Sequence, residues 1–229
     1  GIFTVTAGKI DLTNYFDNNV SANDETTQFI SGAFVNSSAF AVPANSPGVR
    51  LRTTLADIFH LQVGLSSADN SGKDLLKDVY RIASVGFTLC PESDYESNLR
   101  LYGYQHPLAD DGMGWGVSFD NASFGAFNIF ARYGRNEAST SEYCGVESAW
   151  SAGTRFVKNI AGRTTVLGAA FGENDPRQAV LNRERIAEFY IRRQLNEWAS
   201  LSPHVQVVWN AGGSSEQVTI FGIRTHFNF

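Results

Sequence analysis

The sequence lacks the features that mark a helical membrane protein or a nucleic-acid-binding protein. Its 229 residues contain no run of about 20 apolar residues, the length that a membrane-spanning helix requires. The 18 Lys and Arg residues are outnumbered by 23 Asp and Glu residues and form no cluster, so the chain offers no basic surface to nucleic acid. These absences exclude a spanning helix and disfavour nucleic acid as a partner.

Cysteine and histidine are also scarce, and their spacing predicts neither a metal site nor an active site. Cys90 and Cys144 show no metal-binding spacing. They either pair in an oxidising compartment or, as we favour, remain unpaired thiols. The four histidines lie on separate segments, and the chain has no Gly-x-Ser-x-Gly elbow or phosphate-binding glycine loop. We therefore predict no enzyme, metal or other cofactor, although a glycosidase, which needs only two carboxylates, is left open.

The chain is instead rich in glycine and aromatic residues, and its dominant hydrophobic period is two. Segments of about eight to eleven residues, apolar on one face and polar or glycine-bearing on the other, are separated by Gly, Asn, Asp and Ser. We predict about a dozen strands, at residues 2–9, 49–55, around 61–65, 79–89, 98–105, 114–120, 124–134, 145–156, 164–172, 185–194, 203–210 and 218–229, with a doubtful one at 28–35.

Two parts of this pattern leave room for interpretation. Residues 185–198 also approximate a helical face, but the same run alternates well as a strand, which we favour. Longer polar connections are expected at residues 68–78, 136–143 and 173–183, whereas other strands are joined by a few residues. Such a mixture of long and short connections suits a barrel with two different rims.

Composition alone would favour a soluble β-sandwich over a membrane barrel. The position of arginine helps to distinguish the two, because several arginines lie on the polar face of strands that are otherwise apolar. A charged side chain facing lipid at mid-depth costs roughly 2 to 4 kcal/mol, so in a spanning strand it must point into a wet interior. A soluble surface would explain any single one of them as well. The candidate pore-lining residues are Arg50, Arg52, Arg100, Arg132, Arg155, Glu188, Arg192 and Arg224.

The chain end gives a second argument for a membrane barrel. Phe221, Ile223, Phe227 and the terminal Phe229 share one face of a strand whose other face carries polar residues and glycine. A strand that ends on phenylalanine resembles the signal read by the outer-membrane assembly machinery, whereas soluble domains more often end in frayed polar residues. These four residues are the candidate assembly signal, although glycine at position 222 departs from its commonest form.

Two passages resemble a known family, the carbohydrate-selective porins called OprB. In that family a strand ends in Gly-Lys and is followed by Asp-Tyr-Phe-Asp-like and Asn-Asp-x-x-Thr-Gln-Phe segments. The matching residues here are Gly8, Lys9, Tyr15, Phe16, Asp17, Asn23, Asp24, Thr27, Gln28 and Phe29, with Asn14 where Asp is frequent; the closing region matches at Pro203, Val205, Gln206, Phe221, Gly222, Ile223, Arg224, His226 and Phe229.

The resemblance implies a transmembrane, antiparallel, up-and-down β-barrel in the bacterial outer membrane. Because family members resemble sixteen-stranded barrels, residues 1–229 form one barrel domain that is either a smaller closed barrel or, as we favour, lacks N-terminal strands. The implied function is passive diffusion of small hydrophilic solutes, with sugars favoured. A general or inorganic-ion porin and, from another class, a soluble all-β carbohydrate-binding module remain as alternatives.

The expected partners are membrane lipid, sugars, the assembly machinery and, with no particular residue to support it, a second copy of the chain. Residues 11–24 suit a loop folded towards the pore, since Asn and Asp favour irregular backbone. Its candidate constriction residues are Asp17, Asp24 and Glu25, while Tyr15 and Phe16 would serve equally well as packed loop anchors. Tyr102, Tyr104 and Trp115 are candidates for sugar contact, although packing or a membrane-interface girdle explains them better.

Overall fold

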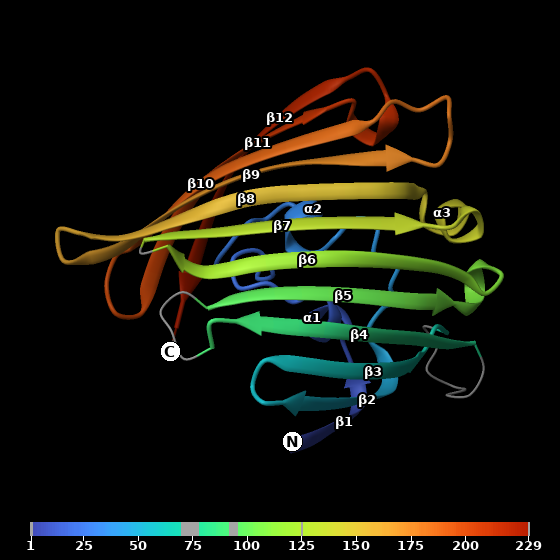
Figure 1. Ribbon diagram of the computed structural model, residues 1–229. Helices are drawn as coiled ribbons and strands as arrows, with labels where there is room; N and C mark the ends of the chain where they lie inside the picture. Colours follow the sequence, from blue (N-terminus) through green and yellow to red (C-terminus); the bar gives the residue numbers. More distant parts are fainter. Residues whose placement is uncertain (1, 70–77, 92–95, 125, 229) are drawn as a thin grey trace.

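The chain folds into one twelve-stranded antiparallel sheet in which each strand pairs with the next along the sequence (Figure 1). The computed structural model describes residues 2–69, 78–91, 96–124 and 126–228. The strands are β1 (Ile2–Ile10), β2 (Ser46–Leu55), β3 (Phe59–Ser67), β4 (Val79–Leu89), β5 (Ser97–His106), β6 (Gly112–Phe124), β7 (Phe127–Asn136), β8 (Val146–Ile160), β9 (Arg163–Pro176), β10 (Glu184–Gln194), β11 (Ala199–Trp209) and β12 (Gln217–Phe227). The predicted up-and-down β-barrel architecture is confirmed.

The alternation of side chains explains why these segments form the wall of a barrel. On β4, Tyr80 and Ile82 point to the inner face and are buried, whereas Phe87 and Leu89 point outward and are 40% and 49% exposed. The same outward exposure of large apolar side chains recurs around the sheet. A continuous apolar outer surface of this size would be unfavourable in water and is suited to lipid.

The remaining elements are short helices in the connections. They are α1 (Thr13–Phe16), α2 (Gly32–Val35), α3 (Ala138–Cys144) and the 3₁₀ turns η1 (Pro107–Ala109) and η2 (Ala211–Gly213). No helix in the described part of the chain is both long and apolar enough to cross a membrane.

Four local predictions can now be compared with the structure. The doubtful strand at residues 28–35 is wrong, because this segment contains α2 and its two phenylalanines, Phe29 and Phe34, pack against the inner wall. Residues 185–194 form β10, so the strand interpretation is confirmed. The connection expected at 136–143 contains α3, that at 173–183 begins only after β9 ends at Pro176, and most of 68–78 lies outside the described residues. Cys144 is a free thiol, as favoured.

The two rims of the sheet differ in the length of their connections. One rim carries residues 11–45, 68–78, 107–111, 137–145, 177–183 and 210–216, and the other carries 56–58, 90–96, 125–126, 161–162 and 195–198. Outer-membrane barrels have long extracellular loops and short periplasmic turns. The first rim is therefore the extracellular one.

β1 and β12 are the two edges of the sheet. Within the described residues each of them has one hydrogen-bonded neighbour, and no pairing joins the two. The smaller closed barrel is thus not the arrangement seen in this structure.

Candidate functional site

The connection between β1 and β2, residues 11–45, lies inside the curve of the sheet and contains α1 and α2 (Figure 1). We call it the luminal loop. It is longer than the segment 11–24 that the sequence indicated, because its second half also packs on the inner wall. Two apolar clusters fix it there. One joins Phe16 and Phe40 to the inner faces of β4 and β5, and the other joins Phe29 and Phe34 to those of β7, β9 and β10.

Glycines in the wall make room for the aromatic rings beneath the luminal loop. Tyr102 on β5 lies directly opposite Gly116 on β6 in the strand pairing. A Cβ atom at Gly116 would lie only 2.4 Å from the Cζ atom of Tyr102. The ring of Tyr102 therefore lies directly on the backbone of Gly116, where a larger residue would clash with it. Phe40 of the loop packs on the ring of Tyr102, with the ring centroids 4.7 Å apart. This arrangement keeps the rings close to the wall.

Arg132 on β7 is the main polar anchor of the luminal loop. Its side chain is 1% exposed, and its Nε donates to Oδ1 of Asp17 at 3.0 Å. Its Nη1 donates to the carbonyl oxygen of Phe34 at 2.7 Å, and its Nη2 donates to the carbonyls of Asp17, Ala22 and Val35. One guanidinium thus joins three separate parts of the loop. Asp17 also accepts a hydrogen bond from the amide of Ser37 at 2.6 Å and is fully buried.

Glu188 on β10 anchors the loop by accepting rather than donating. Its two carboxylate oxygens accept the amides of Ile30 and Ser31, each at 2.8 Å. His204 Nδ1 lies 2.9 Å from Oε1 of Glu188, and His204 Nε2 lies 2.9 Å from the hydroxyl of Ser202. This order of Ser, His and Glu is that of a hydrolase triad. However, Ser202 is 2% exposed and the glutamate is occupied by loop amides, so the arrangement orients an anchor and leaves no room for a substrate.

Three further predicted arginines also bind carbonyl oxygens of the luminal loop. Arg155 donates to Val20 at 3.0 Å, and Arg192 donates to Thr27 at 3.3 Å. Arg224 donates to the carbonyls of Glu25 and Gln28 at 2.6 and 2.8 Å. These side chains lie on the inner face, as the alternation required, but they touch the loop backbone.

The other three arginines line a polar pocket of about 610 Å³ between the luminal loop and β2–β5. Arg50 lies over the ring of Tyr15, 4.4 Å from its centroid, and donates from Nε to Gln62 Oε1 at 2.8 Å. Arg52 lies on the same face of β2, and Arg100 on β5 pairs with Asp120.

A chain of hydrogen bonds crosses the floor of this pocket from strand to strand. His60 Nδ1 lies 3.1 Å from Arg52 Nη2, and its Nε2 lies 2.8 Å from the hydroxyl of Thr88. Thr88 donates to Asn98 at 2.9 Å, and Asn98 donates to Asp120 at 3.1 Å. Because the alternation is read one strand at a time, the sequence could not reveal this network across β2 to β6.

The remaining candidate residues lie away from this pocket. Asp24 accepts hydrogen bonds from Thr26 and Thr27 within the loop, and Glu25 is exposed. Tyr102 and Tyr104 are buried under the loop, whereas Trp115 points outward and is 45% exposed. Within the described residues, no three His, Cys, Asp or Glu side chains are grouped so that they could bind a metal ion.

The wall, the luminal loop and the polar pocket can now be compared with known proteins. Residues 121–229 match the carbohydrate-selective porin, OprB family. The predicted resemblance to the OprB family is confirmed for this part of the chain. It is also the part that contributes β7 to β12, including the loop anchors Arg132 and Glu188.

Similar chains include an uncharacterized protein of Aquifex aeolicus (strain VF5), which is 26% identical over 225 residues. That alignment covers 98% of this chain and 64% of the Aquifex protein, so the chain spans less than two thirds of the relative's length. Among solved structures, Pseudomonas putida OprB has a TM-score of 0.72 and 14% identity, covering 97% of this chain and 68% of its own. The outer membrane channel DcaP of Acinetobacter baumannii has a TM-score of 0.56 and 16% identity, covering 91% and 70%.

These comparisons and the outward apolar surface agree with each other. The fold is that of an outer-membrane porin barrel, and the predicted location in the bacterial outer membrane is confirmed. The soluble carbohydrate-binding module, the alternative from another class, does not explain the lipid-facing wall.

Proposed function

We propose that residues 1–229 act as one domain that forms the selective part of an outer-membrane porin for small neutral sugars. The observation that carries this proposal is the charge balance of the polar pocket. Its lining holds three arginines against Asp57 and Glu96, and the third acid, Asp120, pairs with Arg100 from below. The local formal charge is therefore zero, which favours a neutral solute over an ion of either sign.

The hydrogen-bonding groups of the pocket suit the hydroxyl-rich surface of a sugar. Arg52 can donate to a sugar hydroxyl, and His60 can donate or accept according to its tautomer. The amides of Gln62 and Asn98 lie on the same wall. Each of these groups already has a protein partner, so a passing sugar exchanges hydrogen bonds and is not trapped by an unpaired charge. Weak, replaceable contacts are what diffusion through a channel requires. No bond is made or broken in this process.

The proposal can be tested by osmotic swelling of liposomes that contain the full-length protein. We expect glucose to permeate several times faster than gluconate or glucosamine, which have similar size and carry opposite charges. Equal permeation of all three solutes would refute sugar selectivity and favour the general or inorganic-ion porin.

A charge variant links this selectivity to the polar pocket. Replacing Arg50 and Arg52 by Gln removes two positive charges and leaves Arg100 against three acids, so cations should then permeate several times faster than anions. The matched control is Arg193→Gln, on β10, whose side chain bonds near the short-turn rim and is not part of the pocket. Reversal potentials in a salt gradient measure the change, and an unchanged potential in the double variant would argue that solutes take another path.

The last strand supports a proposed role as the assembly signal. Phe221, Ile223 and Phe227 share the outward face of β12 and are 82%, 77% and 50% exposed. Their side chains are therefore accessible to the assembly machinery. Phe229 lies outside the described residues. Phe227→Ser should lower the folded, heat-modifiable fraction in the outer membrane, whereas Thr225→Ser on the same strand should not.

A further inference from the structure

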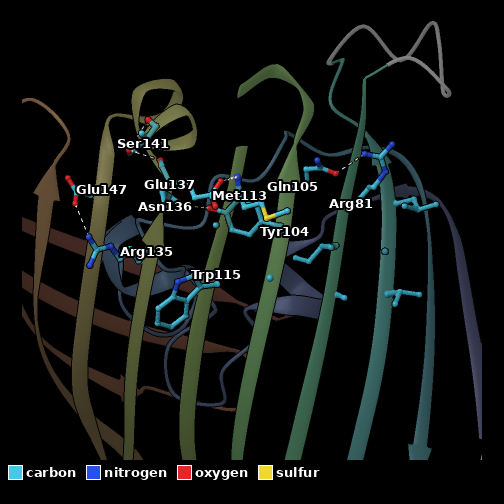
Figure 2. A pocket seen from close by; sticks show the side chains of 18 of the residues that line it. Arg81, Tyr104, Gln105, Met113, Trp115, Arg135, Asn136, Glu137, Ser141 and Glu147 are labelled. Carbon is cyan, nitrogen blue, oxygen red and sulfur yellow. Dashed lines mark hydrogen bonds and ion pairs between the residues drawn. The ribbon is translucent and has the colours of Figure 1, made fainter. Parts of the chain in front are cut away.

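A groove runs down the outer, lipid-facing surface of β3 to β7, beginning at the extracellular rim (Figure 2). Its upper part has a volume of about 930 Å³, and its lower part has a volume of about 610 Å³. The two parts share Ala83, Gly103 and Trp115, so they form one continuous depression. We call it the outer groove.

The upper end of the outer groove is charged, with an excess of arginine. Arg81, Arg135 and Arg177 line it together with Glu137 and Glu147. Figure 2 shows Arg135 directed to Glu147, at 3.2 Å, and Arg81 directed to Gln105, at 2.8 Å. Neither Arg81 nor Arg177 has a carboxylate partner among the described residues, and both are exposed. Two cations at this end are thus available to an anion.

The lower end is lined mainly by apolar side chains. Leu61, Val85 and Leu101 line it, and Leu61 and Leu101 are 41% and 47% exposed. The floor is formed by the small residues Ala83 and Gly103, while Trp115 rises on one side. A Cβ atom at Gly103 would meet only the carbonyl oxygen of Gly114, at 3.9 Å, so the space above this glycine is open.

We propose that the outer groove binds a glycolipid of the outer leaflet that carries two phosphates, with one phosphate at Arg81, the other at Arg177 and an acyl chain along Ala83 and Gly103. The proposal rests on the positions of the charged and the apolar residues along the membrane normal. Cations lie at the extracellular rim, where lipid head groups lie, and the apolar floor lies deeper, at the level of acyl chains.

Native mass spectrometry of the detergent-solubilised full-length protein, titrated with lipid A, tests this binding. We expect one lipid A molecule to bind preferentially over phosphatidylethanolamine and phosphatidylglycerol. The double variant Arg81→Gln/Arg177→Gln should bind it at least tenfold more weakly, since each arginine would lose a charge-assisted bond. Gly103→Leu should also weaken binding severalfold, because its side chain fills the groove without touching the wall.

Two controls separate this site from general lipid contact. Arg185→Gln removes an outward arginine at the same rim that is paired with Glu173, and Ala187→Leu adds bulk to the outer face of β10. Both variants should bind lipid A as the wild type does, and all variants should remain heat-modifiable, which shows that they fold.

The proposal is overturned if the Arg81/Arg177 variant binds like Arg185→Gln, or if phosphatidylglycerol binds as well as lipid A. It is also overturned if cysteine cross-linking through Met113→Cys joins two copies of the chain in the native membrane, because the groove would then be a protein interface.

Discussion

Replacing Arg132 by Gln should release the luminal loop from the wall without unfolding the barrel. The substitution removes the partner of a fully buried carboxylate, Asp17, and the donors to four backbone carbonyls of the loop. Glutamine can replace one or two of these donors and carries no charge. The strand pairs of β7 with β6 and β8 are backbone interactions and do not depend on this side chain.

The size of the effect follows from the burial of the ion pair. Both side chains are 1% exposed or less, and breaking a buried pair by removing one partner costs about 3 to 5 kcal/mol. Release of the loop hydrates Asp17, so this cost falls on the attached state alone. The equilibrium between attached and released loop should therefore shift by about two to three and a half orders of magnitude.

Chymotrypsin cleavage and single-channel recording can measure this release. The luminal loop contains Phe16, Phe29 and Phe34, which are buried against the wall and should resist cleavage until the loop leaves it. In Arg132→Gln we expect faster cleavage at these sites, together with larger and noisier conductance. Arg155→Gln is the matched control, because Arg155 donates one hydrogen bond to the loop among the described residues, at 3.0 Å, and its loss should change cleavage by less than tenfold.

A double-mutant cycle with Asp17→Asn tests whether the Arg132–Asp17 ion pair supplies the energy that holds the loop on the wall. If Arg132 and Asp17 act as a pair, their effects on loop release should be strongly non-additive, by more than about 1 kcal/mol. Cleavage and conductance in Arg132→Gln that match those in Arg155→Gln would refute the conclusion that Arg132 is the main anchor.

Three further changes should affect the loop in different ways. Gly116→Val should displace the ring of Tyr102 and lower the stability of the folded barrel by about 1 to 3 kcal/mol, measured by urea unfolding in detergent. Glu188→Gln should replace one acceptor of the loop amides by a donor and speed hydrogen exchange at Ile30 and Ser31 about tenfold or more. Partial burial tends to raise the pKa of Asp24, but hydrogen bonds from Thr26 and Thr27 hold the pKa below its ordinary value of 3.8. Its contribution to loop stability should be complete above pH 3.8 and lost as the pH falls through the lowered pKa. Cleavage of the loop by pepsin, a protease that is active in acid, measures this loss.

Each of these changes has its own control and its own contradicting outcome. Gly103→Val adds the same side chain to the open outer face and should leave stability nearly unchanged; an equal loss there would show that strand glycine as such is responsible. Unchanged exchange at Ile30 in Glu188→Gln would show that the carboxylate does not hold the loop. Asp24→Asn should abolish the acid transition, and a transition that persists in this variant would have to come from another carboxylate.

The strands could be predicted from the sequence because lipid and water impose opposite demands on the two faces of each one. Residues 79–89 were predicted with the bounds that β4 has, and the remaining strands differ mainly at their ends, where hydrogen bonding continues beyond the alternation. The error at 28–35 has the same origin. Phe29 and Phe34 are apolar because they pack on the inner wall, and a period of two cannot distinguish that surface from lipid.

The sequence could predict which face of the sheet the candidate site residues lie on, but not which groups they contact. The arginines could be assigned to the inner face, since a charge cannot face lipid cheaply. Which of them line the polar pocket and which hold the luminal loop depends on the path of the loop. That path is fixed by backbone carbonyls such as those of Ala22 and Phe34, and a carbonyl oxygen is the same for every residue type.

The way in which the wall holds the luminal loop has a consequence for how such channels can diverge. The anchoring arginines recognise mainly main-chain oxygens, and residues 11–45 contain no Lys or Arg of their own. Side chains on the exposed side of the loop, such as Asn14 and Asn18, can therefore be exchanged while its attachment is preserved. A barrel of this kind could acquire a new solute preference by point substitutions in one short stretch of sequence, without any compensating change in its strands.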